Sequence, residues 1–250
     1  MDLTRWKGKV ALVTGASTGI GFATATGLAK AGMRVAVTAR NAGRLEELKA
    51  ALDGAAVLPV TADLQKEADI RKLFQTVREA WGGVDVLINN AGLGFLGQLS
   101  EQSPEDWRAM LDVNVMALSL CVQEALADMK SKPEGHIINI SSIAGHRVPP
   151  SNANPWYAAT KHAVRAITDA LRIELVNAHR PVRVGMISPG VVETEFHDRA
   201  TRGGGDSKAF YSRFKPLRAE DVADVVFYML SAPPHVQIHD VVMRSVEQPF

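Results

Sequence analysis

Seven short runs rich in β-branched and other apolar residues alternate along the chain with longer stretches whose apolar residues recur at helical spacing. The runs lie at 9–14, 34–39, 56–62, 84–90, 136–141, 182–188 and 240–244. The helical stretches lie at 19–31, 44–52, 67–81, 104–129, 157–177 and 219–231. Continuous apolar strands that alternate with helices are typical of a parallel sheet buried on both faces. The chain is therefore predicted to have an α/β fold, with helices on both faces of a doubly wound sheet.

The chain has the material for one sizeable core. It has 250 residues, of which 46% are hydrophobic, and no internal repeat or linker divides it. One domain over 1–250 is predicted. The least regular segment lies at 193–216, where three consecutive glycines interrupt any helix, and a segment of this length in a compact domain is usually functional. We expect a flap there.

Charge and targeting signals point to a small-molecule partner. The net charge is +1, with no basic block or acidic tail, so neither a nucleic acid nor a membrane surface is expected as a partner. The N-terminus has no leader pattern and no apolar run approaches the roughly 20 residues of a membrane span, which predicts a soluble cytoplasmic protein. The one cysteine, Cys121, lies on an apolar stripe and is expected to be a buried structural thiol. No metal site is expected, because His235 and His239 follow two prolines and lead into a strand.

A glycine-rich turn follows the first predicted strand. The sequence TGASTGIG places Gly15, Gly19 and Gly21 between strand 9–14 and the next helix. Glycines let the backbone approach a pyrophosphate, and the free N–H groups that open the helix carry partial positive charge. The spacing differs from the better-known Gly-x-Gly-x-x-Gly pattern. Its position after the first strand nevertheless predicts a dinucleotide-binding, Rossmann-type fold.

The end of the second strand predicts which adenosine ribose the turn accepts. An acidic residue there bonds the ribose 2′-hydroxyl, whereas an arginine can meet a 2′-phosphate. Here Ala39 carries no carboxylate and Arg40 follows it. NADP(H) is therefore favoured over NAD(H), although Arg40 also fits an ordinary solvated loop cation.

A tyrosine and a lysine, Tyr157 and Lys161, stand four residues apart in the helix predicted at 157–177. Four residues make about one helical turn, so both side chains are expected on one face. A free tyrosine has a pKa near ~10 and needs a nearby cation before it exchanges protons near neutral pH. Taken alone, the pair also fits a packed aromatic beside a solvated lysine.

Two further polar residues have both an ordinary and a functional interpretation. Ser142 follows the strand predicted at 136–141, and the neighbouring Ser141 is an alternative candidate for a functional serine. Either residue can also be an ordinary serine that ends the strand. Asn114 can kink or cap its helix. From the residues alone these alternatives stay open.

Seven motifs in order give the chain a resemblance that spans nearly all of it: TGASTGIG, Asp63-Leu64, NNAG at 89–92, Asn114 in DVNVMAL, NISSIAG at 139–145, Tyr157-x-x-x-Lys161 and SPGVVET at 188–194. Together they resemble the short-chain dehydrogenase/reductase family. The segments GHRVPP, SPGVVET and HVQIHDVVMRSVEQ are most similar to its branch of NADP-dependent carbonyl reductases and 3-hydroxy-acid dehydrogenases.

The resemblance implies a catalytic set of Asn114, Ser142, Tyr157 and Lys161. Tyr157 would be the general acid/base, Lys161 would stabilise its phenolate and reach the nicotinamide ribose, and Ser142, three residues before Gly145, would give a second hydrogen bond. Asn114 would hold a water that relays protons. The residues expected at the cofactor are Gly15, Ser17, Thr18, Gly19, Ile20, Gly21, Arg40, Asn41, Asp63, Leu64, Asn90, Ala91, Gly92, Tyr157, Lys161, Pro189, Gly190, Val192 and Thr194. Of these, Asp63 would bond the adenine amino group.

Substrate is expected beyond the carboxyl ends of the strands, beneath the flap. The residues placed to line that space are Leu93, Phe95, His146, Trp156, Phe196 and Phe210. Their apolar character favours a hydrophobic ketone or secondary alcohol, cyclic or steroid-like. The proline-stiffened loop that ends near Tyr157 is expected to bulge outward as a rim of the pocket.

The resemblance also implies a homodimer or homotetramer. Two other functions stay open. The first is dehydrogenation of 3-hydroxy acids, with His146 or Arg147 meeting a carboxylate. The second is NADP(H) binding without turnover, which the intact catalytic set disfavours.

Overall fold

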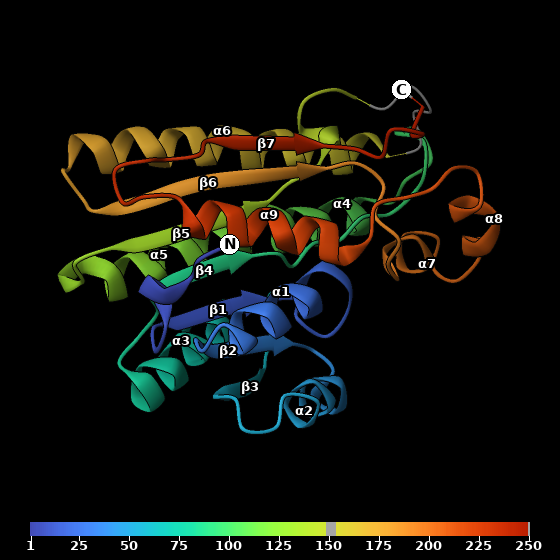
Figure 1. Ribbon diagram of the computed structural model, residues 1–250. Helices are drawn as coiled ribbons and strands as arrows, with labels where there is room; N and C mark the ends of the chain where they lie inside the picture. Colours follow the sequence, from blue (N-terminus) through green and yellow to red (C-terminus); the bar gives the residue numbers. More distant parts are fainter. Residues whose placement is uncertain (149–153, 250) are drawn as a thin grey trace.

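Seven strands form one parallel sheet in the computed structural model, which describes residues 1–148 and 154–249. In the order in which they pair, they are β3 (Val57–Thr61), β2 (Arg34–Ala39), β1 (Val10–Thr14), β4 (Val86–Asn89), β5 (Gly135–Ile140), β6 (Val182–Pro189) and β7 (Asp240–Met243). The order runs outward in both directions from the β1–β4 pair (Figure 1), so the sheet is doubly wound. The predicted fold class is confirmed.

Helices cover both faces of the sheet (Figure 1), and each face has its own hydrophobic core. Helices α1 (Gly19–Lys30), α2 (Ala42–Ala50) and α9 (Ala219–Ser231) pack on one face. The other face is covered by α3 (Glu67–Trp81), α5 (Leu118–Asp128) and α6 (Pro155–Asn177), with α4 (Pro104–Leu111) against α6. The central strands β1, β4, β5 and β6 are buried along their whole length, as expected of a parallel sheet covered on both faces, whereas the edge strands β3 and β7 are only partly buried.

The helix predicted at 104–129 is not continuous. A π-helical segment, Asp112–Ala117, separates α4 from α5 and contains the buried residue Asn114. A π-helix widens one turn by a residue and often occurs at functional sites. The correction follows from tertiary context, because the apolar spacing on both sides of Asn114 is ordinary helical spacing and does not reveal the wider turn.

The helical run Pro104–Ser131 corrects a second expectation. By length and composition it could cross a membrane, with a mean hydropathy of 1.4 in its most apolar stretch, whereas no run of that length was expected. The core helix of a globular protein can have the same composition. Here Cys121, Val122 and Ala125 of α5 are buried in the core on the sheet, and burial raises the pKa of the Cys121 thiol to about 12.

The flap expected at 193–216 stands at the carboxyl ends of the strands (Figure 1). It contains two short helices, α7 (Phe196–Ala200) and α8 (Ser207–Tyr211), on either side of the three glycines. Its base is fastened by the Tyr211 hydroxyl, which donates to the Thr194 carbonyl at 2.8 Å, and by a bridge between Val192 and Leu217. The segment is therefore more ordered than its glycine content indicated.

Gly27 of α1 packs beneath Phe227 of α9, where a Cβ atom would lie 2.7 Å from the ring atom Cε2. We predict that Gly27→Ala lowers the free energy of unfolding by about 1–3 kcal/mol, because the ring must move in a well-packed core. Gly43→Ala in α2 is the matched control. Its Cβ would meet nothing nearer than 3.4 Å, so the loss of helical glycine should leave stability equal or higher. Denaturant unfolding measures the free energy of unfolding of both variants. A Gly27→Ala protein as stable as wild type would contradict this packing.

Candidate active site

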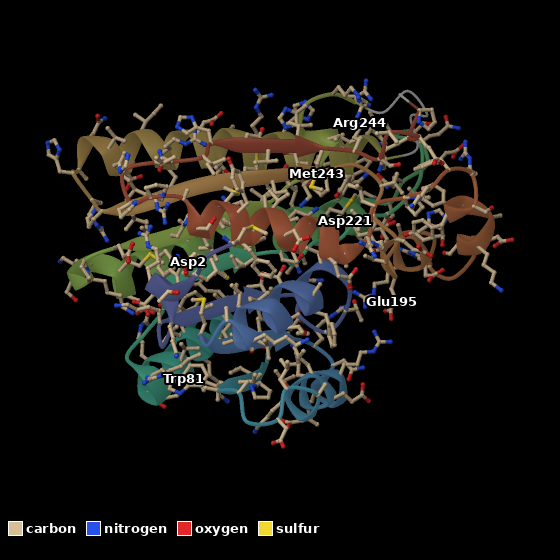
Figure 2. The ribbon with its side chains drawn as sticks, in the orientation of Figure 1. Asp2, Trp81, Glu195, Asp221, Met243 and Arg244 are labelled. Carbon is tan, nitrogen blue, oxygen red and sulfur yellow. The ribbon has the colours of Figure 1, made fainter. Side chains whose placement is uncertain are left out.

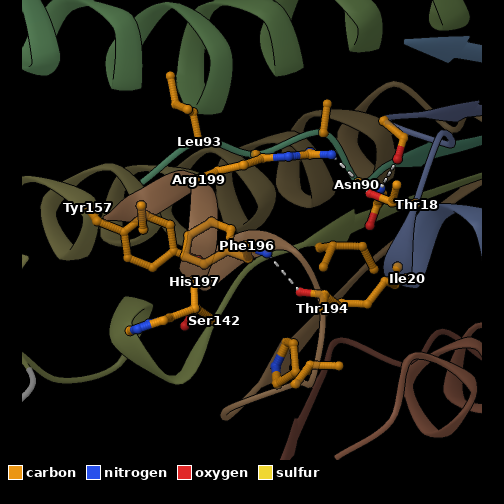
Figure 3. A pocket seen from close by; sticks show the side chains of 18 of the residues that line it. Thr18, Ile20, Asn90, Leu93, Ser142, Tyr157, Thr194, Phe196, His197 and Arg199 are labelled. Atoms are coloured by element: carbon orange, nitrogen blue, oxygen red, sulfur yellow. Dashed lines mark hydrogen bonds between the residues drawn. The ribbon is translucent and has the colours of Figure 1, made fainter. Parts of the chain in front are cut away.

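One cavity of about 820 Å³ runs along the carboxyl ends of the strands and under the flap. It spans the β1–β4 pair, where the strand order reverses and where open α/β sheets bind ligands. Its volume is within the usual range of about 300–1,000 Å³ for small-molecule sites. Figure 3 shows side chains that line it, from Thr18 and Asn90 at one end to Tyr157 and Leu93 at the other.

The glycine turn packs closely against the loop after β4 and the base of the flap. Gly15 and Gly19 have left-handed φ angles of +65° and +57°. A Cβ on Gly15 would lie 2.9 Å from Cα of Ala91, and one on Gly19 would lie 2.8 Å from Cγ2 of Thr194. Thr18 precedes α1 without a side-chain cap, so the first N–H groups of the helix are not bound by it. A glycine-rich helix N-terminus whose first N–H groups have no side-chain cap fits a pyrophosphate.

Asn90 joins the glycine turn to the end of β4. Its Nδ2 donates to the carbonyls of Thr14 at 2.8 Å and Gly15 at 3.1 Å. The Thr14 hydroxyl in turn accepts from the backbone N–H groups of Asn90 and Ala91, each at 3.0 Å. These bonds hold the turn in shape before any ligand arrives.

The other expected cofactor residues lie around the same cavity. Those that line it are Gly15, Ser17, Thr18, Gly19, Ile20, Arg40, Asn41, Asp63, Leu64, Asn90, Ala91, Gly92, Tyr157, Lys161, Pro189, Gly190, Val192 and Thr194. Gly21 lies behind the lining, packed against the Gly15 carbonyl group. At the end near β2, Arg40 is exposed and has no hydrogen bond or ion pair with any part of the chain that the structure describes. It is available to an anionic group of a ligand.

An ion-pair network that the sequence did not reveal crosses this end of the cavity. Glu195 of the flap accepts from Arg44 of α2 and from Arg199 of α7, each at 2.8 Å, and Arg199 also donates to the Thr18 hydroxyl at 3.2 Å. The hydrogen bond from Arg44 is the main reason why the pKa of Glu195 is lowered. Glu195 lies beside the carboxyl ends of the strands (Figure 2). Arg199 is only four residues from Glu195, but Arg44 is distant in sequence, so no local pattern could have found the link to α2.

Ser142, Tyr157 and Lys161 meet at the opposite end of the cavity. Ser142 follows β5 and hydrogen-bonds Tyr157, whereas the rival Ser141 is buried with its hydroxyl 3.4 Å from the Lys161 carbonyl. The Tyr157 ring packs against Phe196, with ring centroids 5.4 Å apart (Figure 3). Of the two serines, only Ser142 faces the tyrosine hydroxyl.

The pKa values of this group differ from the sequence-based expectation. Withdrawal from water raises the pKa of Tyr157 to about 12, and the hydrogen bond with Ser142 only partly offsets this. Lys161 was expected to stabilise the phenolate. That role stays a prediction. The Lys161 ammonium donates to the Ile140 carbonyl at 2.9 Å and lies 5.7 Å from the centre of the Tyr157 ring, and burial lowers its own pKa to about 8. Without a cofactor, burial favours the neutral form of Tyr157.

Asn114 fastens the loop after β4 to α6. Its Oδ1 accepts from the Leu93 N–H at 2.7 Å, and its Nδ2 donates to the Leu93 carbonyl at 2.7 Å and to the Thr160 hydroxyl at 2.9 Å. Both amide protons are therefore engaged within the protein. The expected water relay to Lys161 stays a prediction.

The six residues expected around the substrate divide into two groups. Leu93, Phe196 and Phe210 line the cavity, and Phe210 stacks on His197 with centroids 4.0 Å apart. The other three are turned elsewhere: Trp156 stacks on Trp107, Phe95 lies under Arg202, and His146 contacts Ser188 and Asp240.

Sequence position alone placed the second group wrongly, because neighbouring residues in a loop or a first helical turn point in different directions. The expected bulge before Tyr157 includes residues 149–153, which lie outside the described part of the chain. Within the described part, no group of three His, Cys, Asp or Glu side chains is placed to hold a metal ion.

We predict that Tyr157 of the cofactor-free protein does not ionise near its usual pKa of 10.0 but only near pH 12. Because the pKa of the Tyr157 hydroxyl is raised, this hydroxyl stays neutral as the pH rises past 10, where an ordinary tyrosine ionises. Ultraviolet absorbance of phenolate, compared between wild type and Tyr157→Phe, isolates this group from the other tyrosines. A difference that develops below pH 10 would show that Lys161 outweighs burial.

Comparison with known proteins places the chain in a family. The family described as short chain dehydrogenase matches residues 9–203. Dehydrogenase/reductase SDR family member 11 of Mus musculus is 46% identical over 98% of this chain and 97% of its own, and farnesol dehydrogenase of Aedes aegypti is 44% identical over 99% and 100%. The closed form of serine dehydrogenase complexed with NADP+ superposes with a TM-score of 0.90, at 34% identity over 96% of both chains. The chain belongs to the short-chain dehydrogenase/reductase family.

Proposed function

We propose that the protein is an NADP(H)-dependent oxidoreductase that interconverts an apolar ketone and its secondary alcohol. The observation that carries the proposal is one cavity with two chemically distinct ends. One end has the bare glycine turn and Arg40, whose guanidinium has no partner among the described residues, and the other has Ser142, Tyr157 and Lys161.

Reduction of a carbonyl builds negative charge on its oxygen, so a proton donor and a second hydrogen bond must point at that atom. The neutral Tyr157 phenol supplies the proton, and the Ser142 hydroxyl supplies the second hydrogen bond. Lys161 lies beneath the tyrosine ring, where an ammonium stabilises the phenolate left behind. The nicotinamide cofactor, held at the glycine turn, supplies the hydride.

The cofactor preference rests on the end of β2. Ala39 has no carboxylate to bond a ribose hydroxyl, and Arg40 has no partner within the described residues. A guanidinium that is free and solvent-exposed is suited to a phosphate, since it can form two parallel hydrogen bonds with its oxygens. NADP(H) is therefore the proposed cofactor.

The substrate end favours an apolar molecule. Hydrophobic side chains that line the cavity include Leu93, Leu96, Val113, Phe196, Phe210 and Phe214, and of these Phe196 packs on Tyr157. The similarity to a farnesol dehydrogenase supports an apolar alcohol or carbonyl compound.

The alternative is a 3-hydroxy acid, which the similarity to a serine dehydrogenase favours. Two cations, Arg147 and Arg213, also line the cavity and are suited to meet a carboxylate. The homodimer or homotetramer and the cytoplasmic location stay predictions.

A panel of cyclic ketones, steroids, isoprenoid carbonyls and 3-oxo acids with NADPH tests the function through loss of NADPH absorbance. We expect turnover of the apolar compounds, and loss of turnover by a factor of about 10³ or more in Tyr157→Phe, since only the transferable proton is removed. NADPH binding, measured by its fluorescence, should stay near that of wild type. Substantial ketone reduction by Tyr157→Phe would refute the assigned acid, and no turnover by wild type would favour the binding-protein alternative.

We predict that Ala39→Asp combined with Arg40→Ala shifts the preference from NADPH toward NADH. The new carboxylate would bond a ribose hydroxyl and repel a 2′-phosphate, while the cation that meets the phosphate is gone. The ratio of kcat/KM for the two cofactors is the measure. Lys30→Ala, at the far end of α1, is the control and should leave the ratio unchanged. An unchanged ratio in the double variant would mean that another group selects the cofactor.

A further inference from the structure

A polar cluster of His146, Ser188 and Asp240 joins the turn that carries Ser142 to the last two strands. His146 Nε2 lies 2.9 Å from Ser188 Oγ and 3.1 Å from Asp240 Oδ2. Ser188 Oγ donates to Asp240 Oδ1 at 3.0 Å. Ser188 is fully buried, and the side chains of His146 and Asp240 expose only 22% and 25% of their surface. None of the three lines the cavity, so the cluster acts on the site indirectly.

The arrangement is not that of a Ser-His-Asp hydrolase. In such a triad the serine and the carboxylate contact different nitrogens of the imidazole, so that the ring can pass a proton. Here the same Nε2 faces both oxygens, and Ser188 is closed off from solvent. The cluster therefore serves to hold His146 in place.

His146 and Ser142 are the two ends of one short turn. Ser142 precedes a 3-10 helical turn, Ile143–Gly145, and its hydroxyl oxygen accepts from the Ala144 N–H at 3.1 Å. His146 follows the turn, and its N–H donates to the Ile143 carbonyl at 3.0 Å. Because the serine oxygen accepts from Ala144, its proton is left to donate. A shift of His146 is transmitted to Ser142 through this single turn.

The turn is held from two sides. On one side Gly145 lies against α6, so close that a Cβ would be 2.7 Å from the Lys161 carbonyl. On the other side His146 reaches Ser188 on β6 and Asp240 on β7. The first contact sets how near the turn comes to the helix of Tyr157, and the second sets how the turn is rotated about that contact.

We propose that His146, held by Asp240 and Ser188, is a positioning residue that aims the Ser142 hydroxyl at the substrate carbonyl. The inference rests on the proposed function, in which Ser142 hydrogen-bonds the oxygen that gains charge. Loss of one such donor costs about 10²–10³ in kcat, and a misplacement of about 1 Å has effects of similar size. Asp240, which lies on the last strand and does not line the cavity, thereby becomes part of the catalytic geometry.

A double-mutant cycle tests this inference. We expect His146→Ala to lower kcat about 10- to 100-fold with little change in KM, because the donor acts mainly in the transition state. In a Ser142→Ala background the same substitution should change kcat less than about twofold, because no hydroxyl is left to aim. His146→Gln offers an amide N–H near the position of Nε2 and should recover most of the loss.

His239→Ala is the matched control, because His239 is exposed and directly precedes Asp240. It should keep the kcat of wild type, and NADPH fluorescence should show unchanged cofactor affinity in every variant. Should His146→Ala fail to fold, Asp240→Asn takes its place in the cycle, since it keeps the shape of the side chain and weakens the hold on the imidazole.

Equal losses with and without Ser142 would overturn the inference, because they would mean general structural damage. So would a His146→Ala enzyme with the kcat of wild type while Ser142→Ala is impaired. A wild type that reduces no ketone overturns the proposed function itself, and a Ser142→Ala enzyme as active as wild type removes the role of the serine. These outcomes are distinguishable, since only the last two concern the proposed reaction.

Discussion

A row of buried side-chain hydrogen bonds holds together the three elements on which the candidate site depends. Asn89 at the end of β4 donates to Asn139 of β5 at 3.0 Å, and Asn139 donates to Thr168 of α6 at 2.9 Å. Asn139 and Thr168 are fully buried, and Asn89 nearly so. A buried amide without a partner costs about 1–3 kcal/mol, so the row fixes one register between the strands and the helix. Ser142 and Tyr157 meet because β5 and α6 are locked in this register.

The electrostatics of the site follow from that burial. An amine and a phenol withdrawn from water both resist charge, which lowers the pKa of Lys161 to about 8 and raises that of Tyr157 to about 12. Neutral tyrosine is a proton donor, so under the proposed function the protein without a bound cofactor is prepared for reduction of a carbonyl. Oxidation of an alcohol needs the phenolate, and the positive charge of an oxidised nicotinamide would favour it when the cofactor is bound.

The flap is joined to the nucleotide end by charge and to the substrate end by aromatic contact. Glu195 links Arg44 and Arg199, and the neighbouring residue Phe196 packs on Tyr157. The two residues that make these contacts, Glu195 and Phe196, are consecutive in sequence, so the ion pairs and the aromatic contact are directly linked through the backbone. Exposed ion pairs contribute little to stability, so Glu195 with Arg44 and Arg199 adds little to the free energy of unfolding.

The sequence by itself determined the fold class, the glycine turn and the order of the motifs, because strand and helix periods and short motifs are local signals. The catalytic set that these motifs imply stays a prediction. Placement under the flap was only half predictable: Leu93, Phe196 and Phe210 line the cavity, whereas Phe95, His146 and Trp156 turn away. Only the tertiary structure decided the π-helix at Asn114, the Arg44–Glu195–Arg199 network and the contact of His146 with Asp240. Each depends on groups that are far apart in the chain, and burial, which also sets the pKa of Tyr157, exists only once the chain has folded.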